Sequence, residues 1–232
     1  MAAIMKLPKI TVINATKRHT ASLFIFHGSG GSGDDMKEWI SILNRGEFQF
    51  PHIKVIYPTA PAQPYSLNNG MISNVWHDRK YLTTDSAEHI DSINSMCKTV
   101  SELIEKEVSA GIPYNRIAIG GFSMGGGLSL QLAYRFKQSL AGCFAISSFL
   151  SDTSAVYQSL KENKATSVPP LLYCHGAADT LIPVEWGQKT FQTLKDLGVN
   201  GKFVTMDNLD HELNRQEIHL LKQWILNLLP EA

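Results

Sequence analysis

The 232-residue chain is predicted to form an α/β fold, in which helices cover both faces of a mostly parallel sheet. Short apolar runs alternate with longer amphipathic stretches along almost the whole chain, as expected for strands joined by crossover helices. No internal repeat, low-complexity tract or interdomain linker interrupts this alternation. Because α/β folds of this length are routinely one domain, we expect a single domain over residues 1–232.

The individual elements follow from the hydrophobic periodicity. The predicted strands are short apolar runs at 10–13, 22–26, 53–57, 116–120, 141–146, 171–174 and 202–206. The predicted helices carry apolar residues at helical spacing and lie at 34–43, 84–110, 126–136, 184–197 and 214–229. Ser32 or Asp34 is expected to cap the first helix, and Gly111-Ile112-Pro113 should end the longest one.

Two stretches depart from the alternation of strands and helices. Residues 58–81 contain three prolines and an Asn-Asn-Gly sequence, so we expect an irregular loop that is functional or mobile. Residues 147–170 should carry one short helix near 155–161, which is too short to form a lid domain.

Composition excludes several classes of protein. Lys and Arg total 21 and Asp and Glu total 21, so the chain has no electrostatic reason to bind nucleic acid or an anionic membrane. The three cysteines (Cys97, Cys143 and Cys174) are widely spaced within apolar runs, which argues against disulfides and for a reducing compartment. Residues 1–7 lack the apolar core of a signal peptide, and no window is apolar enough to span a membrane. We therefore expect a cytoplasmic protein.

The pentapeptide Gly121-Phe122-Ser123-Met124-Gly125 is the strongest chemical signal. It follows a predicted strand and opens a predicted helix, so it places a serine on a sharp strand-to-helix turn with its hydroxyl exposed. The flanking glycines suit a crowded backbone where a side chain would clash. The competing interpretation is an ordinary glycine-rich turn.

A serine hydroxyl needs a base to become a nucleophile, and the base needs an orienting acid. Catalytic groups in such sheets lie on loops beyond the carboxyl ends of strands, in the order Ser, Asp or Glu, His when the G-x-S-x-G turn is used. Asp179 follows the strand at 171–174, and His211 follows the strand at 202–206. Their competing interpretations are a helix-capping aspartate and a solvated loop histidine.

Other polar residues fit these roles less well. His175 lies directly beside a strand and is expected to stabilise its loop, and His219 lies inside the last helix. Asp207 and Asp210 are close in sequence to His211, so their side chains cannot easily oppose it.

Acyl transfer also needs backbone donors for the developing oxyanion. Met124, which follows the serine, and Ser29, in the glycine-rich loop after an early strand, are the expected sources of these two N–H groups. A phosphate-binding loop is the rival interpretation for residues 27–33, but that loop lacks the Lys-Ser/Thr ending of a P-loop.

Metal and thiol chemistry are disfavoured by the sequence. The residues that could converge on a metal have no compact ligand spacing, and they are His27, His175, His211 and Asp179. Cys174 and His175 are neighbours on one strand and should point to opposite faces. We therefore expect neither a metal nor any other cofactor.

These motifs together resemble the acyl-protein thioesterase and lysophospholipase family of α/β-hydrolases. The resemblance spans nearly the whole chain in the family's order and rests on Phe26-His27-Gly28, Tyr57-Pro58-Thr59-Ala60-Pro61, Val75-Trp76-His77-Asp78, the Gly120 to Gly126 run, Cys174-His175-Gly176 with Asp179, and Asp210-His211-Glu212. It implies an α/β-hydrolase fold, a triad of Ser123, His211 and Asp179, and oxyanion N–H groups from Ser29 and Met124. The chain departs from the family in having Met124 where Gln is common and Ser29 where Leu is common, which changes the walls of the acyl site.

The resemblance implies hydrolysis of acyl thioesters or esters, with S-acylated (palmitoylated) proteins or small acyl esters as substrates and the protein acting as a monomer. Alternatives are a carboxylesterase that prefers short chains, a lysophospholipase, for which no basic cluster is evident, and a non-catalytic binding protein. Trp76, within the loop at 58–81 that also carries Tyr65, Met71 and Ile72, is expected to line a shallow acyl site or, alternatively, to pack the loop onto the core.

Overall fold

The computed structural model describes residues 8–162 and 167–231. The strands of its main sheet are β1 (Lys9–Ile13), β2 (Ala21–Phe26), β3 (Ile53–Thr59), β6 (Ile117–Phe122), β7 (Gly142–Ile146), β8 (Leu171–Gly176) and β9 (Gly201–Met206). The helices are α1 (Gly33–Asn44), α2 (Ile90–Ser109), α3 (Met124–Gln131), α4 (Ala155–Glu162), α5 (Val184–Asp196) and α6 (Arg215–Leu228). A π-helical turn, η3 (Leu132–Phe136), continues α3.

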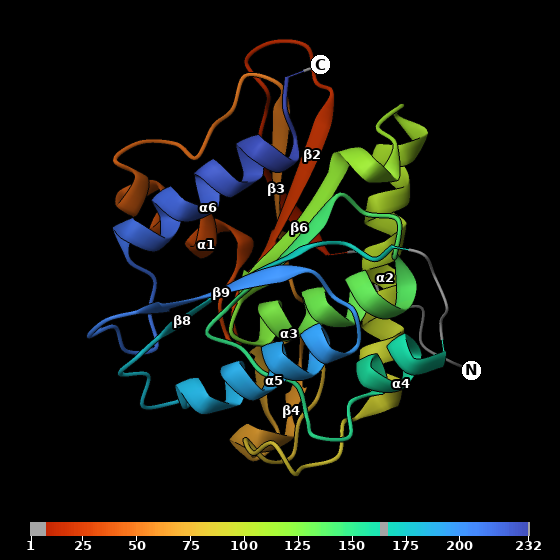
Figure 1. The fold of residues 1–232 in the computed structure, drawn as a ribbon, viewed down its shortest axis with the longest axis vertical. Coiled ribbons are helices and arrows are strands. Elements are labelled where there is room, and N and C mark those ends of the chain that lie inside the picture. The colour runs from red at the N-terminus through yellow and green to blue at the C-terminus, as the bar shows by residue number, and fades with distance from the viewer. Residues whose placement is uncertain (1–7, 163–166, 232) are drawn as a thin grey trace.

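The seven strands lie in the order β1-β3-β2-β6-β7-β8-β9. β1 pairs antiparallel with β3, and the other pairs are parallel. Helices α1 and α6 cover one face of the sheet, whereas α2, α3, α4 and α5 cover the other (Figure 1). This arrangement confirms the predicted α/β-hydrolase architecture, and among the described residues no inserted segment forms a lid.

Each face of the sheet has its own hydrophobic core. Alternate residues of β2 enter the two cores, with Phe24 and Phe26 on the side of α2 and α3, and Leu23 and Ile25 on the side of α1 and α6. All of these side chains are buried. Because β2 packs on both faces, its sequence is an almost continuous apolar run and lacks the alternation of apolar and polar residues seen in strands with one exposed face.

The predicted helix at 84–110 begins only at Ile90, because the preceding residues are held by another segment. The carboxylate of Glu88 accepts hydrogen bonds from the Ser154 hydroxyl and the Ala155 N–H, at 2.6 and 3.0 Å. The carbonyl of Thr84 accepts a bond from the N–H of Asp152. These tertiary contacts replace the first turns of the predicted helix.

The expectation of an irregular loop over residues 58–81 is partly wrong. Two short strands, β4 (Ala62–Tyr65) and β5 (Met71–Asn74), pair antiparallel as a separate hairpin. Asn69 and Gly70 form its turn with φ of 52° and 77°, a conformation that asparagine and glycine tolerate best. The residues interpreted as breakers therefore build the hairpin.

The remaining predicted elements agree with the structure within a few residues. Ser32 caps α1, since its side chain accepts a hydrogen bond from the N–H of Asp35, and the short helix near 155–161 is α4. β8 continues to Gly176, so His175 belongs to the strand rather than to the loop. Residues 1–7, for which the sequence predicts no signal peptide, lie outside the described residues, and the single domain over 1–232 stays a prediction.

Candidate active site

Ser123 occupies a strained turn between β6 and α3. Its φ and ψ are 54° and −121°, a conformation that costs a non-glycine residue about 1–3 kcal/mol. Three backbone hydrogen bonds hold it there: its N–H donates to the carbonyl of Ile146, and its carbonyl accepts from the N–H groups of Gly126 and Gly127. The turn is therefore fixed by the neighbouring strand and by the first turn of the helix.

The glycines around Ser123 are required by close contact with the end of β2. A Cβ atom on Gly121 would lie 2.5 Å from the carbonyl oxygen of Phe26, and one on Gly125 would lie 2.4 Å from the same oxygen. Side-chain atoms do not approach backbone this closely. The G-x-S-x-G pattern thus brings the serine against the loop that follows β2.

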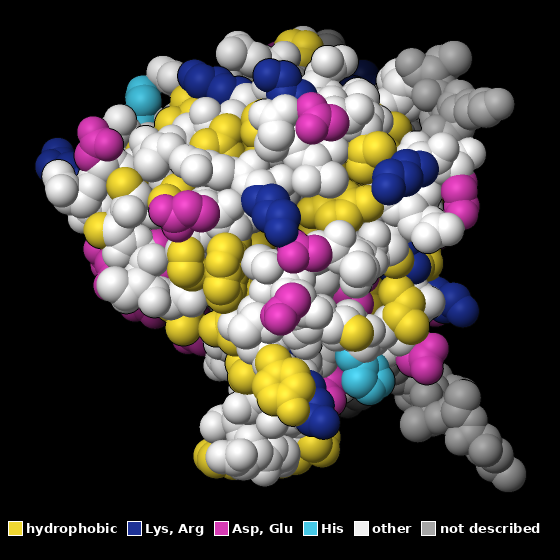
Figure 2. Space-filling view, turned by 60° about the horizontal axis from the view of Figure 1, so that its bottom comes forward, with side chains coloured by type: hydrophobic (Ala, Val, Ile, Leu, Met, Phe, Trp, Pro, Cys, Tyr) yellow, Lys and Arg dark blue, Asp and Glu magenta, His cyan; other side chains and the backbone are white. Residues whose placement is uncertain are grey.

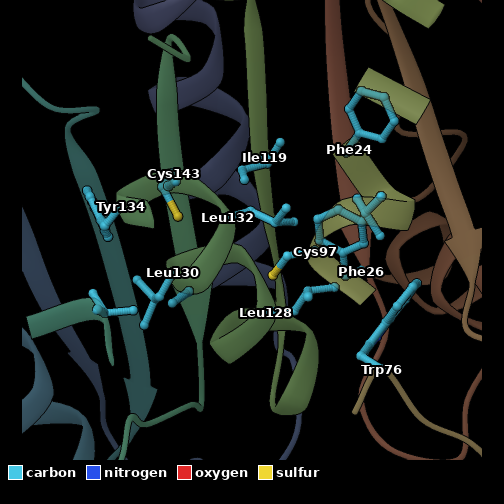
Figure 3. Close-up of a cluster of buried hydrophobic side chains, with 14 of the residues drawn as sticks. Phe24, Phe26, Trp76, Cys97, Ile119, Leu128, Leu130, Leu132, Tyr134 and Cys143 are labelled. Atoms are coloured by element: carbon cyan, nitrogen blue, oxygen red, sulfur yellow. The ribbon is translucent and has the colours of Figure 1, made fainter. Parts of the chain in front are cut away.

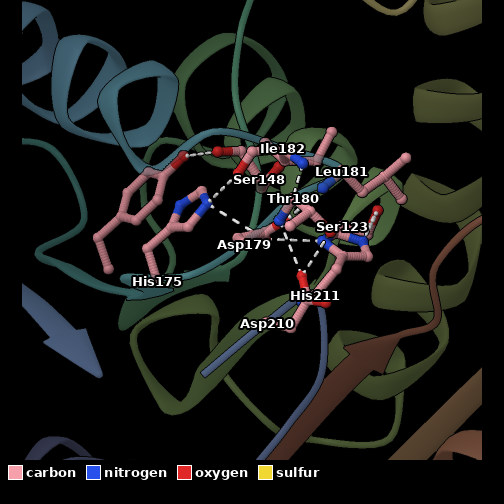
Figure 4. A network of polar contacts seen from close by, with 10 residues as sticks. Ser123, Ser148, His175, Asp179, Thr180, Leu181, Ile182, Asp210 and His211 are labelled. Carbon is pink, nitrogen blue, oxygen red and sulfur yellow. Dashed lines mark hydrogen bonds and ion pairs between the residues drawn. The ribbon is translucent and has the colours of Figure 1, made fainter. Parts of the chain in front are cut away.

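The structure brings the three predicted polar residues together (Figure 4). The Nε2 atom of His211 lies 3.1 Å from the hydroxyl oxygen of Ser123, and its Nδ1 lies 2.8 Å from Oδ2 of Asp179. They stand on three separate loops, after β6, β8 and β9, at the carboxyl edge of the parallel strands. This is the hydrogen-bonding chain that a serine nucleophile requires.

Asp179 is held by several polar partners. Its side chain is fully buried, and its Oδ1 accepts the backbone N–H groups of Leu181 and Ile182 at 3.0 and 2.7 Å. The other oxygen, Oδ2, lies closest to Nδ1 of His211 and is 3.4 Å from Nε2 of the buried His175. A carboxylate held in this way sets the imidazole orientation, with Nδ1–H donating to the carboxylate and Nε2 free to accept.

The competing residues have other partners. Asp210 accepts hydrogen bonds from the backbone N–H groups of Thr180 and His211, so it ties the two loops together without touching the imidazole ring. His175 is buried on β8, and its Nε2–H donates to the carbonyl of Ile182 at 2.8 Å. Burial lowers the pKa of His175. His219 bonds Gln223 on the exposed side of α6.

The two expected oxyanion residues are adjacent. The hydroxyl of Ser29, on the loop after β2, lies 3.7 Å from the sulfur of Met124. Met124 is the first residue of α3, where backbone N–H groups have no intrahelical acceptor. The loop after β2 and the first turn of α3 therefore meet beside Ser123, and the oxyanion role of their N–H groups stays a prediction.

His27 organises the Ser29 loop, a role that the sequence did not reveal. Its Nδ1–H donates to the carbonyl of Gly28 at 2.6 Å, and its Nε2 accepts the N–H of Ala60 at 2.9 Å. Burial lowers the pKa of His27, which favours the neutral ring that both bonds require. The Phe26-His27-Gly28 sequence drew attention to this loop. It could not reveal the role of His27, because the hydrogen-bond partner Ala60 lies far along the chain.

The expectation that Trp76 lines the substrate site is wrong. Its side chain has 0% exposure, and its indole N–H donates to the carbonyl of His27 at 2.8 Å. The ring packs edge-on against Phe26 (Figure 3). The alternative interpretation, packing of the loop onto the core, describes Trp76 correctly. Met71 and Ile72 are exposed on β5, and neither lines a hollow beside Ser123.

Three hollows surround the site. One of about 160 Å³, open solvent included, is lined by Ser123 together with Arg79 and Phe149. A second hollow, of about 420 Å³ with open solvent included, is also lined by Arg79 and Phe149 and runs along residues 77–89. A third, of about 400 Å³, is mostly apolar and is lined by Trp39 and Phe122 beside the Ser29 loop. Sequence reasoning assigned no role to Arg79, Phe149 and Trp39, and it named Phe122 only as part of the pentapeptide around Ser123.

The described part of the chain has no cluster of metal ligands, no exposed cysteine and no helix that could span a membrane. Among residues 8–162 and 167–231, no group of three or more His, Cys, Asp and Glu side chains is arranged to hold a metal ion. The three cysteines are free and buried, and burial raises the pKa of Cys97 to about 12. Within the same residues, no helix is long and apolar enough to cross a membrane.

Comparison with known proteins agrees with the fold and the geometry. The family model described as Phospholipase/Carboxylesterase matches residues 7–229, and the chain belongs to this family of α/β-hydrolases. It is 48% identical to lysophospholipase-like protein 1 of Mus musculus over 99% of this chain and 97% of that protein. It is 35% identical to acyl-protein thioesterase 1 homolog 1 of Dictyostelium discoideum, over 92% of each chain.

Solved structures show the same fold. The crystal structure of Zea mays acyl-protein thioesterase 2 superimposes with a TM-score of 0.79 at 26% identity, covering 96% of this chain and 99% of that one. The crystal structure of Arabidopsis thaliana SOBER1 gives a TM-score of 0.78 at 25% identity, covering 90% of this chain and 99% of that one. The chain is accordingly a hydrolase.

Proposed function

We propose that this protein hydrolyses acyl thioesters or oxygen esters through an acyl-enzyme formed on Ser123. The observation that carries the proposal is the continuous hydrogen-bonding chain from Ser123 through His211 to Asp179, built on a strained strand-to-helix turn. His211 acts as the general base and acid, and Asp179 orients it. S-acylated proteins are the proposed substrates, since relatives of this chain are named acyl-protein thioesterases.

The reaction has two halves. Ser123 Oγ attacks the acyl carbonyl while its proton passes to Nε2 of His211, which forms an imidazolium that Asp179 stabilises. The tetrahedral intermediate collapses, the bond to the leaving thiol or alcohol breaks, and His211 returns the proton to that group. Water then attacks the acyl-enzyme with His211 again as base, and the free acid leaves as Ser123 regains its proton.

The backbone N–H groups of Ser29 and Met124 are proposed to bind the oxyanion. Donors of this kind contribute about 3 kcal/mol each in comparable sites. Because they are backbone groups, the side chains at both positions leave the chemistry unchanged and instead shape the walls around the acyl group. His27 and Trp76 support this role by holding the Ser29 loop.

The acyl chain is proposed to occupy the apolar hollow that Trp39 and Phe122 line beside the Ser29 loop. This hollow replaces the loop at 58–81 as the proposed acyl site, because Trp76 is buried. Its volume of about 400 Å³, open solvent included, favours short or moderate chains and supports the carboxylesterase alternative. A lysophospholipase would need to hold a phosphate head group, and no basic cluster lines the hollow among the described residues.

Labelling with a fluorophosphonate tests the nucleophile. The wild-type protein should be labelled and Ser123→Ala should not, while Ser129→Ala, a buried serine further along α3, should keep the label. Labelling that persists in Ser123→Ala would refute the assignment. No labelling of the wild type would favour a binding protein on a hydrolase fold.

A series of acyl chains tests the substrate class. Thioesters and oxygen esters from acetyl to palmitoyl, together with a lysophospholipid, should show a maximum of kcat/KM at short or moderate length. A pronounced optimum at palmitoyl would contradict the proposed acyl hollow. A monomer in the cytoplasm remains our expectation, which light scattering and cell fractionation would check.

A further inference from the structure

Arg79 lies between the nucleophile and the hollow along residues 77–89. It lines both the small hollow that contains Ser123 and the hollow of about 420 Å³ along residues 77–89. Its guanidinium carbon lies 4.7 Å from the centre of the Phe149 ring, which also lines both spaces. The side chain therefore forms part of the wall that a bound substrate would meet.

The segment that carries Arg79 is firmly held. The carboxylate of Asp78 accepts the N–H of Ser66 at 2.8 Å, the hydroxyl of Ser66 at 2.6 Å and the N–H of Arg79 at 2.9 Å. The N–H of Asp78 in turn donates to the hydroxyl of Ser92 on α2. The adjacent acidic side chain is thus committed to fixing the backbone, and the guanidinium projects from a rigid base.

The charge of this guanidinium has no direct counterion. Among the described residues no carboxylate lies within ion-pair distance of it, and its side chain contacts the Phe149 ring. The side chains of Tyr65 and Glu88 attract it from beyond ion-pair distance. The Glu88 carboxylate accepts its hydrogen bonds from Gln131, Ser154 and Ala155. Burial lowers the pKa of Arg79, yet an arginine stays charged in proteins.

A partly buried cation without a counterion is costly to keep, and arginine is well suited to bind carboxylates and phosphates with its planar fork. We propose that Arg79 is a specificity-determining residue that binds an anionic group of the substrate, a carboxylate or phosphate a few atoms from the scissile carbonyl. This inference rests on the function proposed above. The hollow beside Ser123 and Arg79 is too small for a long acyl chain, so only a small group of the substrate can lie next to the guanidinium.

The anion could belong to the acyl group or to the leaving group, and two matched pairs of esters separate these sources. For the acyl side, p-nitrophenyl hydrogen glutarate is compared with p-nitrophenyl valerate. For the leaving group, 4-acetoxybenzoate is compared with its methyl ester. Each kcat/KM is divided by the rate constant for hydroxide-catalysed hydrolysis of the same ester, which removes intrinsic reactivity.

In the wild-type protein, the anionic member of at least one pair should be preferred by on the order of tenfold, as expected for a charge-assisted contact. Arg79→Gln should bring that ratio close to one, and Arg79→Lys should retain part of it. Lys80→Gln is the matched control. It also removes a positive charge, but Lys80, the residue after Arg79, is exposed and lines neither hollow. It should keep the wild-type ratio.

Two results would overturn the inference. One is a wild-type ratio close to one in both pairs, which needs no variant and is unaffected by folding defects. The other is an equal loss for both members in Arg79→Gln, which would indicate that the side chain only supports the loop. Turnover of the neutral esters separates this failure from failure of the proposed function, because the latter abolishes hydrolysis and fluorophosphonate labelling of the wild type.

Discussion

At the scale of single residues, the site depends on how Asp179 is held. Its two oxygens face different partners: backbone N–H groups on one side, and the His211 ring with the more distant His175 ring on the other. The side chain is an acceptor throughout, so replacing one oxygen by an amide nitrogen would place a donor against the imidazole N–H. The ring would then turn to the tautomer that cannot accept the serine proton.

We therefore expect Asp179→Asn to lower kcat by roughly 10³–10⁴, with a much smaller effect on the melting temperature. Stopped assays with a p-nitrophenyl ester would measure the loss. Asp207→Asn is the control, because Asp207 is an exposed aspartate near the same loops. Full activity in Asp179→Asn would show that the aspartate only caps its loop.

Glu217 is a buried acid outside the site. Its side chain is on the first turn of α6, is 0% exposed, and neither carboxylate oxygen has a hydrogen-bond partner among the described residues. Burial raises its pKa to about 8. The folded protein thus keeps a proton that the unfolded chain loses near pH 4.5, and this proton stabilises the fold fully only below that pH.

The stability due to Glu217 should fall as the pH rises from about 4.5 to about 8. Glu217→Gln removes this titration, so the variant should gain on the order of 3 kcal/mol relative to the wild type between pH 5 and pH 8. Urea unfolding at both pH values measures the difference. Parallel pH profiles of the two proteins would show that Glu217 is ionised or solvated in the fold.

At the scale of elements, the turn from β6 into α3 is the critical junction. Gly125 faces the carbonyl oxygens of Phe26 and His27, where an added Cβ would lie at 2.4 and 2.6 Å. Gly127, two residues on in the same helix, has its nearest such contact at 3.6 Å, an ordinary van der Waals distance. Gly125 belongs to the pentapeptide around Ser123 and Gly127 does not, and the structure shows that only Gly125 is closely packed.

We expect Gly125→Ala to destabilise the protein by about 1–3 kcal/mol and to reduce turnover, because it pushes the Ser29 loop away from Ser123. Gly127→Ala should leave stability equal or raise it by up to about 1 kcal/mol, as alanine is the better helix former. Thermal unfolding and ester hydrolysis measure both. A neutral Gly125→Ala would contradict the close approach of α3 and β2.

At the scale of the whole molecule, the central strands hold two cores together, while the β4–β5 hairpin stands apart as its own small sheet. On the face drawn in Figure 2, acidic and basic side chains are interspersed without a large area of one sign. This distribution matches the equal numbers of acidic and basic residues. Stability therefore comes from the packed sheet faces, and the surface charge contributes little directional attraction.

Hydrogen exchange should reflect this architecture. Amides of β6, which is buried along its length between β2 and β7, should exchange only through global unfolding. Amides of β4 and β5 should exchange much faster, because Met71 and Ile72 are exposed there. Mass spectrometry on peptic fragments would resolve the two regions, and equal protection in both would contradict the picture of a peripheral hairpin.

The sequence by itself determined the order of the strands and helices, the turn around Ser123 and the loops that carry Asp179 and His211. These features depend on local periodicity, on glycine next to a sharp turn, and on the rule that functional groups follow the carboxyl ends of parallel strands. The family resemblance pointed to the same residues. Local patterns were sufficient because each of these features is encoded within a short stretch of chain.

Only the tertiary structure decided what depends on partners far away in the chain. Trp76 is buried, and the backbone carbonyl of His27 accepts its N–H. Residues 84–89 leave the helix because the segment at 152–155 binds them. Arg79 and Ser123 line the same hollow, which gives Arg79 its proposed role. None of these partners is visible in a local pattern. Burial and charge compensation are properties of the packed chain, and they set both the proposed acyl hollow and the proposed role of Arg79.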